Sequence, residues 1–115
     1  MQSIRILADD LTGALDTAAA FAGQVPVYLD RPPAQSRECS GTRIAVVATP
    51  TRDVPPEEIP AHLQPALKWL QSGRIAFKKV DSLLRGNTFA ELAWLVRNGG
   101  FEKTIFAPAF PRRAA

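Results

Sequence analysis

Short apolar runs alternate with helix-like runs along the chain, and this alternation constrains the fold more than any other feature of the sequence. Five apolar runs have the length and composition of β-strands: 4–8, 25–29, 43–48, 74–78 and 104–107. The run at 43–48 is of the continuous kind that a parallel sheet buries on both faces. The alternation predicts βαβ units, and therefore a single Rossmann-like α/β domain whose mostly parallel sheet of about five strands has helices on both faces. Pro26 suggests an edge position for the second strand.

Helix signals fill the spaces between these strands. The first helix, expected over 12–22, is rich in alanine and ends at Gly23. The second opens at 53–58, where prolines and acidic residues suit a first turn. Its apolar stripe has helical spacing: Ile59, Leu63, Ala66, Leu67 and Leu70. Because Pro65 lies inside that stripe, we expect the helix to be kinked or split there.

The third helix, expected over 88–98, begins with a predicted capping box, in which Thr88 and Glu91 satisfy each other's backbone amides. It stops at Gly99-Gly100. Its expected apolar face consists of Phe89, Leu92, Ala93 and Val96. The two tryptophans, Trp69 and Trp94, lie within helices and are expected to be packing residues.

The composition suits one domain of 115 residues, since 46% are apolar and 22% charged, which excludes a disordered chain. The net charge is +3, but no basic run is interleaved with aromatic residues, so we expect no nucleic-acid partner. No stretch of about 18 apolar residues predicts a membrane span, and the N-terminus does not resemble a signal peptide. Cys39 is the single cysteine and His62 the single histidine, so we expect neither an internal disulfide nor a zinc site. The lack of a disulfide leads us to expect a cytoplasmic location.

Polar residues gather after the strands, where parallel sheets bind ligands. The first strand is followed by Asp9, Asp10, Thr12 and Gly13. The third strand is followed by Thr49, Thr51 and Arg52, and the fourth by the stretch from Lys78 to Asn87. Pro108 and Pro111 follow the fifth. Because the carboxyl ends of parallel strands meet at one edge, we expect these loops to form one site. Two adjacent carboxylates suit a metal, a hydroxyl ligand or a general base, although Asp10 can also simply cap a helix.

The stretch 78–88 is more polar than a strand-to-helix junction requires, and it suits a small anionic ligand. Arg85 offers a planar fork of donors to a carboxylate or phosphate. Gly86 allows close approach of the backbone, and Asn87 can cap the next helix, whose N-terminus attracts anions.

Structural alternatives stay open for the same stretch. Asp81-Ser82 could form a simple turn, and Arg85 could take part in a surface ion pair. Lys78 and Lys79 point to opposite faces of an extended segment, so we expect one to reach the site and the other to be solvated.

Four blocks of the sequence resemble the four-carbon acid sugar kinase family. They are Ala8-Asp9-Asp10-Leu11-Thr12-Gly13-Ala14-Leu15-Asp16, Thr51-Arg52 with 55–58, the stretch 78–87, and 108–111. The resemblance covers essentially the whole chain, and the first and third blocks are the most specific. It implies an enzyme that uses ATP to phosphorylate acid sugars such as threonate or erythronate. In the family, an N-terminal domain holds the sugar and a separate C-terminal domain supplies most of the nucleotide site.

The resemblance also implies roles for individual residues. Asp9, Asp10 and Thr12 would hold the sugar hydroxyls, with Asp10 as the candidate catalytic base. The carboxylate and the remaining hydroxyls would be held by Arg52, Lys79, Asp81, Ser82, Arg85, Gly86 and Asn87. ATP and Mg²⁺ would serve the complete kinase, with neither bound tightly by this chain and with no resident metal.

The chain departs from the family at three places. Leu83 stands where threonine is usual, 48–50 replaces a more acidic stretch, and after Pro111 the tail 112–115 replaces a Gly-Arg pair. We expect residues 1–111 to form the acid-sugar-binding domain and the C-terminal nucleotide-binding domain to be absent, so that the chain alone is inactive. The partner is then a small hydroxy-carboxylate, and a missing C-terminal domain or a homodimer stays open.

Two other functions fit parts of the pattern. A non-catalytic module that binds small acids would carry the same residues. A phosphoacceptor receiver domain fits the length and the acidic pair, but 48–50 offers no aspartate after the third strand and 104–108 lacks the lysine that such domains carry.

Overall fold

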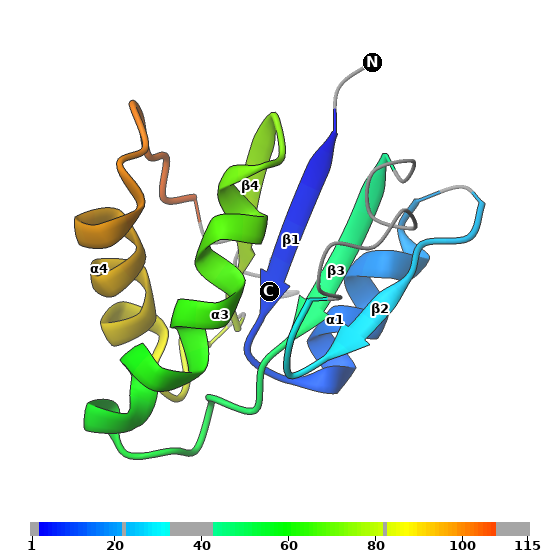
Figure 1. Cartoon of the computed structure of the whole chain (residues 1–115). Helices are drawn as coiled ribbons and strands as arrows, with labels where there is room; N and C mark the ends of the chain where they lie inside the picture. Colours follow the sequence, from blue (N-terminus) through cyan, green and yellow to red (C-terminus); the bar gives the residue numbers. More distant parts are fainter. Residues whose placement is uncertain (1–2, 22, 33–42, 82, 108–115) are drawn as a thin grey trace, which may run out of the picture.

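The computed structural model describes residues 3–21, 23–32, 43–81 and 83–107 (Figure 1). Its elements follow in the order β1 (Ile4–Ala8), α1 (Leu11–Ala19), β2 (Val27–Leu29), β3 (Ile44–Ala48), the 3₁₀ turn η1 (Pro56–Glu58), α3 (Ile59–Gln71), β4 (Ile75–Lys79) and α4 (Thr88–Gly99). The expectations for Cys39, Ser82, 108–111 and 112–115 lie outside the described residues. Of the helices in the described ranges, none has both the length and the apolar character needed to cross a membrane.

The four strands run parallel in the order β2-β3-β1-β4, which confirms the predicted α/β sheet. The short strand β2 lies at an edge, as Pro26 predicted. The register pairs Ala8 at the end of β1 with Ala48 of β3 and with Lys79 of β4. Because the strands end at one level, the loops after β1, β3 and β4 leave the sheet side by side, at the lower edge in Figure 1.

Helices cover both faces of this sheet, as predicted (Figure 1). Leu7 and Val47 pack with α3 and α4 on one face, whereas Ile6 and Val46 pack with α1 on the other. Successive residues of a strand point to opposite faces, so burial on both sides explains why β1 and β3 have continuous apolar sequences. Trp69 is buried on the α3 side, in keeping with its expected packing role.

The prediction of a fifth strand is wrong, because residues 104–107 form no strand. They are exposed, and within the described ranges no backbone hydrogen bond joins them to β4. The segment is held by aromatic contacts instead: Phe101 packs on the core, and the ring of Phe106 lies 5.9 Å from that of Phe89. An apolar run becomes a strand only where its backbone reaches a neighbouring edge, and here a cavity separates the two.

The helix α3 runs through Pro65 without a break, so the predicted split is wrong. An interior proline removes a hydrogen bond and costs about 3 kcal/mol. Leu63, Leu67 and Leu70 around it are buried in the core, and each fully buried leucine contributes about 1.5–3 kcal/mol. The packing of the apolar stripe therefore outweighs the local preference of the proline.

The predicted capping box of α4 is also wrong. Thr88 is the first residue of the helix, and its hydroxyl donates to the carbonyl of Arg85 (2.9 Å), while the N-cap residue Asn87 makes no side-chain cap bond. The buried face is Thr88, Glu91, Leu95 and Gly99. Phe89 and Val96, expected on that face, are exposed. The helix is rotated from the predicted orientation, and the Glu91 carboxylate points inward.

Candidate functional site

Arg52, in the loop after β3, lies among three carboxylates. Its Nη2 is 3.1 Å from Asp9 Oδ1 and 3.6 Å from Asp81 Oδ1, and its Nη1 is 3.3 Å from Asp10 Oδ2. Burial lowers the pKa of Arg52, but the hydrogen bond and charge of Asp9, with the charges of Asp10 and Asp81, outweigh it and raise the pKa. Together with Arg85, which pairs with Asp81, these residues form what we call the carboxylate–arginine cluster.

Asp81 organises the loop between β4 and α4. One carboxylate oxygen accepts from the backbone amides of Leu83 (3.0 Å) and Arg85 (3.1 Å) and from Arg85 Nε (2.9 Å). The other accepts from Arg85 Nη2 (2.9 Å). The side-chain hydrogen bond from Arg85 holds the pKa of Asp81 well below its usual range, although burial opposes it. The turn and the ion pair, two readings left open by the sequence, are thus both present.

The two adjacent aspartates have different environments. Asp9 has only 3% of its side chain exposed and binds Arg52 through both carboxylate oxygens. Asp10 has 28% exposed, and its carboxylate accepts from Gly13 N (2.9 Å), so it caps α1. A Cβ at Gly13 would lie 2.7 Å from that carboxylate oxygen, so a side chain there would disturb the cap. Asp10 is therefore the aspartate that a ligand can reach.

A cavity of about 540 Å³ opens beside the cluster at the carboxyl ends of the strands. Asp9, Asp10 and Arg52 form part of its wall. Leu29, Asp30 and Asp53 also line it, and the sequence reading did not single them out. Leu29 ends the edge strand β2 and Asp30 follows it, so the rule that ligands bind at the carboxyl ends of strands could have found them.

The remaining residues expected in the site lie around this cluster. Lys79 is directed towards α1, where its Cγ lies 3.8 Å from the position of a Cβ at Gly13, and its Nζ donates to Val80 O (2.7 Å). Thr12 is exposed in the first turn of α1. The hydroxyl groups of Thr49 and Thr51 are buried 2.9 Å apart and brace the end of β3.

Lys78 points to the opposite face from Lys79, as predicted, but it is not solvated. Its side chain is 9% exposed, and its Nζ lies 3.4 Å from Oε1 of the fully buried Glu91. Burial raises the pKa of Glu91, and the charge of Asp9 adds to this effect, while Lys78 opposes it. The sequence predicted Glu91 in a capping box with Thr88, so this buried pair is found only in the tertiary structure.

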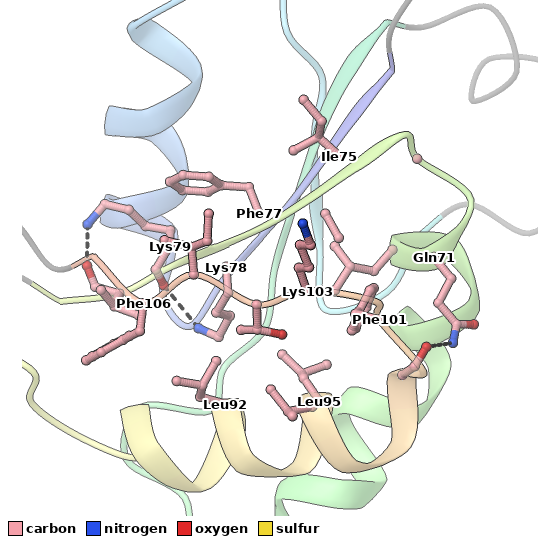
Figure 2. Close-up of a pocket in the computed structure, with 18 of the residues that line it drawn as sticks. Gln71, Ile75, Phe77, Lys78, Lys79, Leu92, Leu95, Phe101, Lys103 and Phe106 are labelled. Atoms are coloured by element: carbon pink, nitrogen blue, oxygen red, sulfur yellow. Dashed lines mark hydrogen bonds between the residues drawn. The ribbon is translucent and has the colours of Figure 1, made fainter.

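A larger cavity, of about 970 Å³, runs along β4 between that strand, α4 and the segment 101–107. Figure 2 shows Phe77, Leu92, Leu95 and Phe106 around it, with Lys78 and Lys79 at one end. Its lining also carries charged side chains of both signs, among them Lys78, Lys79, Asp81 and Glu102. The smaller cavity is the better candidate for a polar ligand because Arg52 meets the carboxylates of Asp9 and Asp10 at its wall. Of the residues expected in the site, Lys79 and Asp81 line the larger cavity instead.

The charged groups of the described site are paired with one another. Within the described ranges, no group of three or more His, Cys, Asp or Glu side chains is arranged to hold a metal ion, and the guanidinium of Arg52 lies between the three aspartates. The N-terminus of α1 is capped by the carboxylate of Asp10, which opposes a phosphate at that position.

Comparisons with known proteins find a matching family model and related kinases. A family model described as "Sugar-binding N-terminal domain" matches residues 4–114. The chain is 36% identical over 109 residues to a D-threonate kinase of Cupriavidus necator, and 29% identical over 112 residues to a D-threonate kinase of Salmonella typhimurium. Each match covers 92% of this chain but 26% of the relative, so the chain spans about a quarter of their length. No solved structure gives a significant match.

Proposed function

The chain belongs to the sugar-binding N-terminal domain family, and we propose that it is the N-terminal part of an ATP-dependent kinase that phosphorylates four-carbon acid sugars of the threonate or erythronate type. The observation that carries this proposal is the carboxylate–arginine cluster beside the 540 Å³ cavity. It combines carboxylates, which bind sugar hydroxyls, with guanidinium groups, which bind a carboxylate.

The environments of the residues suggest a division of roles. Asp10 is the accessible carboxylate, so it binds a sugar hydroxyl and is the candidate base for its proton. Asp9 and Asp81 are buried and hold the arginines. Arg85, with 62% of its side chain exposed, can present the donors that Asp81 does not occupy to the ligand carboxylate.

Charge balance supports a contribution from Lys79. The cluster carries three negative charges (Asp9, Asp10 and Asp81) and two positive charges (Arg52 and Arg85), which leaves a net charge of minus one. A ligand carboxylate would add a second negative charge. Lys79 lies on the α1 side of the same edge and can supply the compensating cation by exchanging its bond to Val80 O. Thr12, and Ser82 outside the described residues, complete the proposed set.

Nucleotide and Mg²⁺ are assigned to a different part of the complete enzyme. The described residues include no glycine-rich phosphate loop, so residues 1–111 are the acid-sugar-binding domain and a C-terminal domain, on the same or another chain, binds ATP. The residues of this chain bind and orient the sugar and can accept its proton. The proposed location is the cytoplasm.

Titration calorimetry of the purified chain with D-threonate and D-erythronate tests this proposal. We expect binding of at least one acid sugar and a loss of about tenfold or more in affinity for Arg85→Ala, because a charge-assisted pair to the ligand is lost. Arg85→Lys should recover only part, since an ammonium lacks the fork. Asp16→Asn, exposed on α1, is the matched control and should bind as the unmodified chain does. Absence of heat from a folded sample would contradict the proposal.

A non-catalytic acid-binding module is the second candidate, and the capped N-terminus of α1 favours it for the chain on its own. An ATP-consumption assay with either sugar separates the two readings. We expect no turnover by this chain alone. Turnover that Asp10→Asn abolishes would mean that the chain is catalytically complete and that the proposed division between two domains is wrong.

A further inference from the structure

Asn87, at the start of α4, is bonded to the loop that carries Arg52. Its Nδ2 donates to the carbonyls of Thr51 (2.8 Å) and Val54 (2.7 Å), and Arg52 O lies at 3.4 Å. An amide nitrogen has two hydrogens, so the two short bonds occupy its donors. The side chain is therefore engaged with backbone on both sides of Arg52, which leaves no donor for a ligand.

Gly86 lies against the same loop from the side. Its φ of +73° is a conformation that side chains rarely adopt. A Cβ there would lie 2.6 Å from both Cγ and the carbonyl oxygen of Arg52 and 3.2 Å from its Cα. The backbone of residue 86 therefore packs directly on the stem of Arg52, at a distance that only glycine permits.

These two contacts act on the residue that joins the carboxylate–arginine cluster. Arg52 reaches Asp9, Asp10 and Asp81 through a long side chain, 22% of which is exposed, and ordering such a side chain costs rotamer entropy. Fixing its backbone and the base of its stem reduces the positions that the guanidinium can take. We propose that Gly86 and Asn87 are positioning residues, which set the guanidinium of Arg52 between the three aspartates and do not donate hydrogen bonds to the ligand carboxylate.

This inference differs from the role that the family resemblance implies for Asn87, namely direct contact with the sugar acid. It also differs from a purely structural role, in which Asn87 anchors α4 without affecting Arg52. The three readings predict different behaviour of the Arg52 side chain.

An NMR experiment that needs no ligand tests the coupling. The Nε–H signal of Arg52, assigned with Arg52→Lys, reports its bond to Asp9. We expect Asn87→Asp and Gly86→Ala to shift this signal and to speed its hydrogen exchange by up to about tenfold, the equivalent of one hydrogen bond. Asn98→Asp is the matched control, because Asn98 makes a similar but exposed bond to Trp94 O at the other end of α4. An unchanged Arg52 signal in folded Asn87→Asp and Gly86→Ala would overturn the inference.

If Asn87→Asp does not fold, Asn87→Ala replaces it in the NMR comparison, because alanine removes the donors without placing a carboxylate against carbonyl oxygens.

A thermodynamic cycle on acid-sugar affinity then extends the test, and this part rests on the proposed function. We expect Asn87→Ala to weaken affinity in the unmodified chain and to have little effect in an Arg52→Ala background. An equal loss in both backgrounds would assign Asn87 a direct ligand contact. Failure of the unmodified chain to bind would contradict the proposed function alone, since the NMR result does not depend on it.

Discussion

Asp81 and Glu91 are both buried acidic residues near the carboxyl ends of the strands, yet their pKa values move in opposite directions. Asp81 accepts four hydrogen bonds, two of them from the guanidinium of Arg85. Glu91 is fully buried, and among the described residues neither of its carboxylate oxygens accepts a hydrogen bond of good geometry, with Lys78 Nζ at 3.4 Å and Thr51 as the other nearby donor. Burial alone therefore does not decide whether a carboxylate stabilises this fold. What decides this is the number of hydrogen-bond donors that point at the carboxylate.

The largest expected effect comes from removing the cation beside Glu91. Lys78→Met should lower the free energy of unfolding by about 3 kcal/mol at pH 7, because a buried carboxylate loses its one ion-pair partner in the described structure. The loss should be smaller at a lower pH such as 5, because the raised pKa of Glu91 makes its protonation easier as the pH falls. Urea unfolding at both pH values measures this difference, with exposed Lys68→Met as the control.

A double variant sharpens the same test. Lys78→Met with Glu91→Leu should recover most of the stability, since a buried ion pair replaced by apolar residues is often neutral or stabilising. An equal loss at pH 7 and pH 5 for the single variant, with no recovery in the double variant, would mean that Lys78 stabilises the fold through packing and not through charge.

A smaller loss is expected at the well-bonded carboxylate. Asp81→Ala should lower the free energy of unfolding by about 2 kcal/mol, because two backbone amides lose their acceptor while exposed Arg85 regains water. Asp81→Asn should lose less, as the amide oxygen can still accept. Denaturant unfolding against Asp16→Ala, an exposed aspartate of α1, gives the comparison. A loss no larger than that of the control would show that the loop does not depend on Asp81.

The pH dependence of stability should separate the two carboxylates, because their pKa values move in opposite directions on folding. The pKa of Asp81 is lowered in the folded state, so its contribution is present above its ordinary value of 3.8 and is lost as the pH falls. The pKa of Glu91 is raised, so its contribution is greatest below 4.5 and is lost as the pH rises through the folded pKa. Unfolding from pH 3 to pH 7 should show a flatter acid limb in Asp81→Asn and a flatter upper limb in Glu91→Gln. Identical curves for the two variants would contradict this assignment.

The smallest effect on stability is expected for Arg85→Ala. Its side chain is 62% exposed, so water replaces most of what the ion pair with Asp81 provides. Thermal unfolding should therefore change less than in any variant above, while the affinity for an acid sugar falls. A large fall in melting temperature with unchanged affinity would make Arg85 a structural residue of the loop.

The sequence alone predicted the parallel α/β sheet and the edge at which polar residues gather. Both follow from local patterns: apolar runs such as that of β3 mark buried strands, and the residues after them must leave at the carboxyl edge. Asp9, Asp10, Arg52 and Arg85 could be placed together for this reason before any contact was known. That these residues bind the acid sugar stays a prediction.

The tertiary structure decided the features that depend on partners far along the chain. Pro65 lies in an unbroken helix because its neighbours are buried, and residues 104–107 form no strand because they do not reach the edge of β4. Glu91 faces inward because Lys78, 13 positions earlier, meets it there, and Asn87 binds carbonyls more than 30 positions away. Local propensity is weak beside such packing, so a sequence pattern specifies which residues share an edge, whereas the long-range contacts specify which of them pair.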